Sequence, residues 1–378
     1  MFCRPVDGIR PDRFCPPHCP RPDCPGHLDR KRFRWKKNGS YRRNCDPRRK
    51  VPRFFCFTCE RGFSRQSFSC EYYLKRPELL LPIAAGLVAG SAHRQLARSL
   101  GCAASTVTRL TARIGRHALL LQAALLERVE ALEEPVVLDH FETFVFSQED
   151  RLGIATAVGQ GSWFVYGFQP APHRGGRRSS RKRAVRAPLP GTPPGSVVRS
   201  TTQTLDLLAS KSSRGFTLVS DDHPAYRIAV ARHATTIDHR VFPNPSRGCG
   251  TDLPRARERD RQMFAVDLLH KLWRHSEAHH HRETIAFGRR SNAVLERAAV
   301  MFCWRNLIKG RSERKRDPTT PAMRLGLTDR PWRWCDAFAR RLFPRRIAVP
   351  ESWMRIYRRE WITPAVGRNT LHDLVQAF

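Results

Sequence analysis

Acidic residues are scarce in this chain of 378 residues, where Asp and Glu total 34 against 68 for Lys and Arg. The formal net charge is therefore +34. A compact protein tolerates self-repulsion of this size poorly unless it binds a polyanion. An arginine-rich composition bias is the alternative explanation, but the magnitude of the imbalance argues against it. The charge therefore predicts nucleic acid as the partner.

Long apolar runs are also missing. A membrane-spanning helix needs about 18 or more uncharged apolar residues, and the longest apolar stretch, residues 79–89, is interrupted by Pro82. The first residues lack the charged-then-apolar order of a signal peptide. We therefore expect no membrane association and a cytoplasmic, nucleoid-associated protein. The length favours two or three domains, because single hydrophobic cores usually stop growing near about 250–300 residues.

Cysteine is sparse except at the start, where seven of the twelve cysteines fall in the first 60 residues. Such clustering favours a local metal site over a disulfide framework in a cytosolic protein. Two pairs have the spacing of a structural zinc site that is held by four thiolates, and the expected ligands are Cys19, Cys24, Cys56 and Cys59. Cys15 and His18 remain possible substitutes in the first pair. We expect residues 1–74 to form a zinc module built on a small β-ribbon.

The same module interleaves basic and aromatic residues, as a phosphate-contacting surface does. The basic and aromatic positions concerned are Arg32, Arg34, Trp35, Lys36, Lys37, Arg42, Arg43, Arg48, Arg49 and Lys50.

Apolar residues recur at three- and four-residue steps between 75 and 134, which predicts an all-helical segment. Residues 91–110 form two short amphipathic patterns around Gly101, and this is the pattern of a helix-turn-helix DNA-binding domain. Ser105 is expected to cap the second helix. The predicted DNA-binding side chains on its polar face are Thr106, Thr108, Arg109 and Arg113. An ordinary helical hairpin is the alternative, and the basic charge favours DNA binding.

From residue 135 to 325 short β-rich runs alternate with helical patterns. The expected strands are 136–146, 153–158, 163–168, 216–220 and 236–242, and the first three are expected to form an antiparallel meander. Residues 169–200 are rich in Arg and Pro and are interpreted as a mobile basic loop. The order of elements matches a ribonuclease-H-like α/β core, and residues 326–378 are assigned to a C-terminal tail. The predicted fold class is thus a multidomain α+β protein.

Two carboxylates occupy strand positions where apolar residues are usual. Asp139 lies in the first expected strand and Asp221 ends the fourth, and these strands are neighbours in a ribonuclease-H-like sheet. Adjacent carboxylates of this kind can hold two Mg²⁺ ions for phosphodiester chemistry. A third acid is expected on the following long helix, with Asp267, Glu277, Glu283 and Glu296 as candidates. The acidic residues expected to be solvated or capping are Glu142, Asp206 and Asp222.

With these residues in view, the chain resembles bacterial insertion-sequence transposases of the DDE class that carry a zinc ribbon and a helix-turn-helix before the catalytic core. The resemblance covers roughly residues 15–325 and is most specific in the segments 54–64, 91–114, 218–226 and 282–290. It implies Asp267 as the third acid, 15 residues before Arg282, with Glu283 as the alternative. It also implies double-stranded DNA with inverted-repeat ends as the substrate, synapsis by a homo-oligomer, and catalytic Mg²⁺.

Two other functions fit the same residues. One is a catalytically inactive DNA-binding regulator derived from a transposase, and the other is a ribonuclease-H-like nuclease. The run His279–His281 is interpreted as a solvated basic face of a helix, because contiguous helical residues point in different directions.

Overall fold

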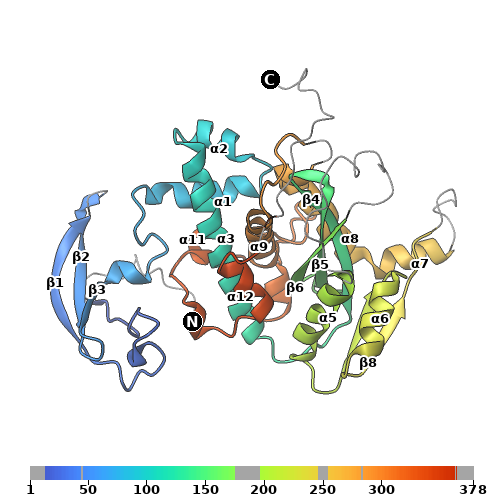
Figure 1. Cartoon of the computed structure of the whole chain (residues 1–378), viewed down its shortest axis with the longest axis horizontal. Coiled ribbons are helices and arrows are strands. Elements are labelled where there is room, and N and C mark those ends of the chain that lie inside the picture. The colour runs from blue at the N-terminus through green and yellow to red at the C-terminus, as the bar shows by residue number, and fades with distance from the viewer. Residues whose placement is uncertain are drawn as a thin grey trace.

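The structure is a computed structural model that describes residues 13–43, 46–174, 196–245, 254–281, 284–361 and 363. It is a mixed α and β protein with two sheets. The N-terminal sheet is antiparallel, with the order β1-β2-β3, and confirms the predicted β-ribbon. It lies at one end of the molecule in Figure 1. Its elements are η3 (Pro25–His27), β1 (Trp35–Arg43), β2 (Asp46–Cys56), β3 (Arg61–Ser64) and η4 (Arg65–Phe68).

Helices follow, as the apolar periodicity predicts: η5 (Pro77–Leu79), α1 (Leu80–Leu87), α2 (His93–Ser99) and α3 (Ala104–Glu127). In α2 and the first turns of α3, the residues at three- and four-residue steps are buried, including Leu96, Val107, Leu110 and Ile114. Gly101 joins the two helices with a φ of 56°, a left-handed conformation that glycine adopts readily.

The second sheet has the strand order β6-β5-β4-β7-β8. Strands β4, β5 and β6 form the predicted antiparallel meander, whereas β7 pairs parallel with β4, and β8 pairs parallel with β7. The five predicted strands are therefore confirmed: β4 (Val136–Val145), β5 (Ser147–Gly159), β6 (Val165–Arg174), β7 (Phe216–Ser220) and β8 (Ile237–Val241).

Helices cover both faces of this sheet (Figure 1). Successive side chains of β4 point to opposite faces of the sheet and contact different helices. The ring of Phe141 stacks on Trp273 of α8, with centroids 4.1 Å apart, whereas His140 lies 2.9 Å from the hydroxyl of Ser200 in α5. Strand β4 is therefore buried between two helical layers. The helices of this region are α5 (Ser196–Ala209), α6 (Pro224–Arg232), α7 (Pro254–Gln262), α8 (Phe264–Ser276), η7 (Ala278–His280) and α9 (Ser291–Leu307).

The predicted basic loop 169–200 is shorter than expected. Strand β6 continues to Arg174, because its pairing with β5 persists to that residue, and α5 begins at Ser196. The remainder of the predicted loop lies outside the described residues. The histidine run 279–281, which the sequence analysis places on a helix face, follows the end of α8 at Ser276, after which the chain turns inward through η7.

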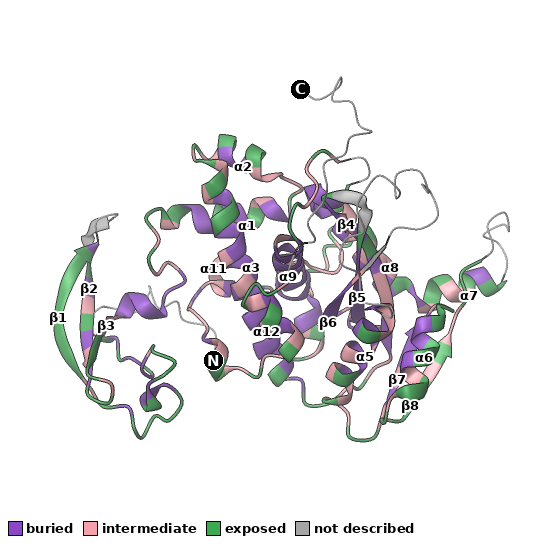
Figure 2. Ribbon diagram, viewed as in Figure 1, coloured by how far each residue is buried: buried purple, intermediate pink, exposed green. Residues whose placement is uncertain are grey.

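The C-terminal segment packs into the core through α10 (Pro321–Arg324), α11 (Trp334–Ala337), η8 (Pro344–Arg346) and α12 (Glu351–Tyr357). Trp353 is fully buried, and its indole N–H donates to the carbonyl of Phe168 in β6 at 2.9 Å. One buried apolar cluster extends from Cys70 to Ile356 (Figure 2). The boundaries expected at residues 134 and 325 thus do not separate hydrophobic cores.

Helix α3 joins the N-terminal region to the sheet. It packs along α9, and its Gln122 donates to the carbonyl of Val165 at the start of β6. Asn306 of α9 donates to the same carbonyl and to Gln122, so a buried polar contact fixes both helices on β6. Among the described residues, none of the helices has the length and apolar character needed to cross a bilayer.

The contact between α3 and α9 leaves no room for a side chain at Gly115. A Cβ atom there would lie 2.4 Å from the carbonyl oxygen of Glu296. We expect Gly115→Ala to lower the free energy of unfolding by about 1–3 kcal/mol, because the clash is with backbone and cannot be relieved by a rotamer change. Urea denaturation measures this loss.

Gly62→Ala is the matched control, since the nearest atom to its Cβ is the carbonyl oxygen of Phe54 at 3.8 Å. Equal stabilities of the two variants would contradict the close packing of α3 on α9.

Candidate functional site: a cysteine cluster and a group of three carboxylates

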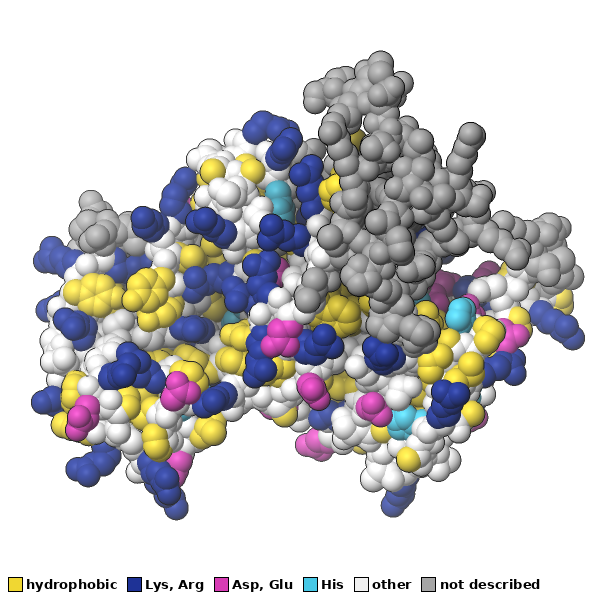
Figure 3. Space-filling view, viewed as in Figure 1, with side chains coloured by type: hydrophobic (Ala, Val, Ile, Leu, Met, Phe, Trp, Pro, Cys, Tyr) yellow, Lys and Arg dark blue, Asp and Glu magenta, His cyan; other side chains and the backbone are white. Residues whose placement is uncertain are grey.

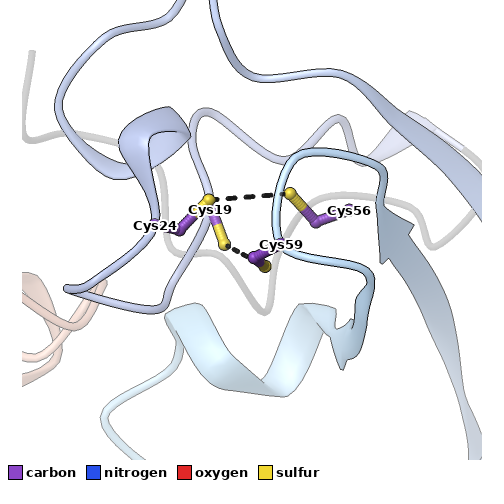
Figure 4. A group of neighbouring side chains, drawn as sticks. All are labelled: Cys19, Cys24, Cys56 and Cys59. Atoms are coloured by element: carbon purple, nitrogen blue, oxygen red, sulfur yellow. Dashed lines mark hydrogen bonds between the residues drawn. The ribbon is translucent and has the colours of Figure 1, made fainter.

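Four cysteines converge in the N-terminal module. Cys19 and Cys24 flank a loop before η3, Cys56 ends β2 and Cys59 lies in the turn to β3 (Figure 4). The sulfur atoms lie 3.8 Å apart for Cys19 and Cys59 and 3.9 Å apart for Cys24 and Cys56. All four sulfurs lie within 4.8 Å of one another. The predicted set of four is therefore brought together.

The geometry fits a zinc ion. Four Zn–S bonds of about 2.3 Å in a tetrahedron hold the sulfur atoms about 3.8 Å apart, which matches the observed separations. Burial would raise the pKa of Cys56, but hydrogen bonds from the backbone of Cys59 and Thr58 lower it overall. Burial raises the pKa of Cys19 and Cys24, so these thiols need a cation to ionise.

The two substitute ligands considered for the first pair are not in this cluster. Cys15 is exposed, whereas His18 is buried and packs edge-on against Phe68, with its Nδ1 on the carbonyl of Cys19. Within the part of the chain that the structure describes, the four sulfurs alone make up the group, so an ion bound by all four would have a structural role and no open position for a substrate.

The cysteine cluster yields a direct prediction. Cys56→Ser should lower the intensity of the thiolate-to-metal charge-transfer absorption of the Co²⁺-substituted protein and weaken metal binding, because a tetrahedral thiolate site loses one of its four ligands. Cys15→Ser should leave this absorption unchanged, because Cys15 lies outside the cluster. Loss of the band in the Cys15 variant would show that the ligand set is wrong.

The pair α2 and α3 presents the residues predicted to contact DNA. Thr108 and Arg109 are exposed, and Thr106 is half-buried. Thr108 donates to the carbonyl of Ala104 and lies 3.1 Å from His93 of α2. Arg113 is half-buried and donates to the carbonyl of Tyr72, so its guanidinium links α3 to the segment that precedes the helical region.

The predicted cap is wrong. Helix α3 begins at Ala104 and its N-cap residue is Ala103, which makes no side-chain cap. Ser105 therefore lies inside the first turn, two residues beyond the N-cap position, where it cannot accept the hydrogen bonds of a cap.

Basic side chains are spread over the face shown in Figure 3, on the N-terminal sheet and on the helices next to it. On β1, Lys36, Lys37 and Arg42 are exposed, and Arg94 and Arg98 are exposed on α2. Arg43 differs from the expectation, because it is buried and its Nη1 lies 2.7 Å from the carboxylate of Glu71. The side chains of Arg48 and Arg49 lie outside the described residues.

The strand register sets Asp139 beside Asp221. Leu138 of β4 pairs with Ser220, the last residue of the parallel strand β7, and each aspartate is the next residue along its chain. Asp267 lies in the first turn of α8, which packs on β4 and β5. The charges of Asp221 and Asp267 both act on Asp139 and raise its pKa. The three acidic residues that the sequence analysis favours therefore share one electrostatic environment.

Asp139 has an altered acidity. Burial, followed by the charge of Asp221, raises the pKa of Asp139 to about 7. Its Oδ1 accepts a hydrogen bond from the Tyr226 hydroxyl at 3.3 Å, and its Oδ2 lies 3.6 Å from Nδ1 of His270. The pKa of His270 is lowered to about 3 by burial, so this imidazole is neutral and does not compensate the carboxylate.

Each of the other two acids has its own polar partner. Asp221 accepts from the side-chain amide of Asn244 at 3.0 Å, whereas Asp267 is bound by both terminal nitrogens of Arg259, with Nη2 at 3.3 Å from Oδ1. Arg259 thus supplies the positive charge that faces Asp267 in this structure.

The other candidates for the third acid are elsewhere. Glu277 is buried against Trp273 and His280, and Glu296 of α9 pairs with Arg359. Glu283 lies outside the described residues. Asp222, one of the acids expected to be solvated, is exposed and pairs with Arg227. It therefore has a different partner from Asp221, its neighbour in the sequence.

Four residues of this environment were missed by the sequence analysis: Tyr226, His140, His270 and Arg259. Two of them had a signal. His270 follows Asp267 by three positions and therefore lies on the same helix face, and Tyr226 follows Asp221 by five positions across the start of α6. His140 connects the Tyr226 hydroxyl, at 2.8 Å, to Ser200 of α5.

Compared with protein-family models and with curated proteins, the chain matches none.

The burial of Asp139, together with the charges of its acidic neighbours, predicts a pH dependence of stability. The pKa of Asp139 rises from 3.8 to about 7 on folding, so its ionisation opposes folding: the penalty is absent below about pH 4 and complete above about pH 7. Without divalent cations, Asp139→Asn should match the wild type near pH 4 and be more stable by about 2–4 kcal/mol near pH 8. Urea denaturation with a chelator present measures the difference.

The exposed neighbour offers a control, because Asp222→Asn should change stability little at either pH. A variant of Asp139 that is less stable than the wild type at pH 8 would contradict the destabilising effect of the buried, ionised carboxylate.

Proposed function

We propose that this chain is a DNA transposase of the DDE class, and that Asp139, Asp221 and Asp267 are its catalytic carboxylates. The observation that carries the proposal is the convergence of these three residues from β4, the end of β7 and the start of α8. They are 82 and 46 residues apart in the sequence (221 − 139 and 267 − 221), so only the fold gathers them.

The topology supports this proposal. Three antiparallel strands followed by two parallel ones, with the first strand in the centre, is the order of a ribonuclease-H-like core. In that core the first and fourth strands are neighbours, as β4 and β7 are here. Helices between the strands cover both faces. The same core also suits a nuclease, so the topology defines the chemistry more closely than the biological role.

The residue types suit a divalent cation. The carboxylates of Asp139, Asp221 and Asp267 are oxygen ligands of the kind that Mg²⁺ prefers, and burial, followed by the charges of the other two acids, raises the pKa of Asp139 to about 7. When bound, two Mg²⁺ ions would stabilise the charge that develops on a phosphodiester during cleavage and joining. Tyr226 orients Asp139 through its hydroxyl, and Arg259 holds Asp267.

DNA binding is the part of the proposal that rests on charge. The net charge of +34 and the exposed basic residues of β1 and α2 suit a DNA backbone, and two consecutive helices joined by a short turn, α2 and α3, support the assignment of a helix-turn-helix. We assign the exposed Thr108 and Arg109, with Thr106, to contacts in the groove. The cysteine cluster, with structural zinc, would hold the basic sheet in shape.

Single carboxamide substitutions test the catalytic assignment. Asp139→Asn, Asp221→Asn and Asp267→Asn should each lower Mg²⁺-dependent cleavage by about a hundredfold or more, because each removes a charged ligand. DNA binding, measured by gel shift, should be retained. The substrate is a supercoiled plasmid that carries both ends of the DNA segment encoding the chain.

Asp222→Asn is the matched control, since Asp222 is adjacent in sequence but pairs with Arg227 on the surface. Joined products from the wild type support a transposase, whereas nicked products alone would favour the nuclease. DNA binding by a wild type without any cleavage would favour the regulator and overturn the catalytic assignment.

A further inference from the structure

Three buried side chains next to the end of α8 face one another and belong to neither site above. They are Glu277, His279 and His280, on the turn that ends α8 and forms η7. Their ligand atoms lie within 4.8 Å of one another, and Oε2 of Glu277 lies 3.5 Å from Nε2 of each histidine. This corrects the expectation of a solvated histidine face: α8 ends at Ser276, and the turn points both rings inward.

One atom of the glutamate and one of the second histidine are already held by neighbours. Oε2 of Glu277 accepts from the indole N–H of Trp273 at 3.0 Å, and Nδ1 of His280 lies 2.9 Å from the hydroxyl of Thr143 in β4. Metal-binding side chains are commonly oriented in this way by a second hydrogen bond. The same two contacts attach this turn to α8 and to the central sheet.

The remaining atoms have no partner. Oε1 of Glu277, Nε2 of His280 and both ring nitrogens of His279 are buried without a hydrogen bond. Glu277 is fully buried, and each histidine is 3% exposed. Leaving such groups unsatisfied costs about 1–3 kcal/mol each, so a core that buries them together is stabilised by a species that binds all three.

A metal cation would satisfy these unpartnered atoms together. Burial lowers the pKa of both histidines well below the usual value, so both rings are neutral and offer lone pairs. Burial raises the pKa of Glu277 to about 7 even though the charge of Arg297 opposes this shift. Arg297 is itself buried, and its Nε and Nη2 have no acceptor, so it does not form a hydrogen-bonded pair with the glutamate.

We propose that Glu277, His279 and His280 form a second metal site, which takes Zn²⁺ and is separate from the cysteine cluster. Two imidazoles and one carboxylate form a ligand set that zinc commonly uses, and they leave a fourth position for water. Bound zinc would fix the end of α8, the helix that carries Asp267, to β4 through His280 and Thr143.

Metal stoichiometry of the full chain tests the proposal without DNA, so the result is independent of the proposed function. After dialysis against Zn²⁺ and removal of excess, we expect two zinc ions per wild-type chain and one in Glu277→Gln and in His279→Gln. His281→Ala is the matched control, because His281 is exposed beside the site and should leave two ions bound. Circular dichroism verifies that each variant is folded.

Co²⁺ spectra of the wild-type protein distinguish the two sites, so this test does not depend on the folding of a variant. In the wild-type protein, Co²⁺ at the cysteine cluster should give thiolate charge-transfer absorption. A second equivalent of Co²⁺ should add visible d–d bands but no further thiolate charge-transfer absorption. The same thiolate-free bands should persist in a Cys56→Ser, Cys59→Ser chain. One equivalent of metal in the wild type, all of it bound by thiolate, would overturn the proposal, as would two equivalents in both Glu277→Gln and His279→Gln.

Discussion

The hydrogen-bonded pairing of β4 with both of its neighbours is the constraint on which the rest of the structure depends. Its antiparallel pairing with β5 and its parallel pairing with β7 make β4 the central strand. One face of β4 packs on α8 and the other on α5. A shift of one residue in this register would send Asp139 to the opposite face of the sheet and replace it with His140.

An acid-poor chain concentrates several of its carboxylates in the interior. Asp139, Glu277 and Glu296 are each buried enough for their pKa to rise to about 7. Carboxylates in such places cost stability unless a cation or a strong hydrogen-bond donor accompanies them. Glu296 has Arg359 as its partner, Glu277 lies in a group of potential metal ligands, and Asp139 lies within the electrostatic influence of Asp221 and Asp267.

The metal sites that we infer would hold different parts of the structure in place. The cysteine cluster would hold a small sheet whose own apolar core is a few aromatic rings, including Phe54 and Phe68. The Glu277 group would fix the far end of α8, and the carboxylate group would lie at the beginning of that helix. Helix α8 therefore connects the proposed chemistry at Asp267 to the buried turn at His279 and His280.

The sequence by itself determined the local features of this protein. The periodicity of apolar residues placed the strands from β4 to β8 and the helices α2 and α3, and the spacing of Cys56 and Cys59 predicted one half of the cysteine cluster, because these signals depend on neighbours along the chain. The tertiary structure decided the rest: which cysteines complete the cluster, that the tryptophan-containing C-terminal segment packs into the core, and that His279 and His280 point inward. Helix ends and inward turns depend on contacts with residues that are distant in sequence, and no local pattern records those contacts.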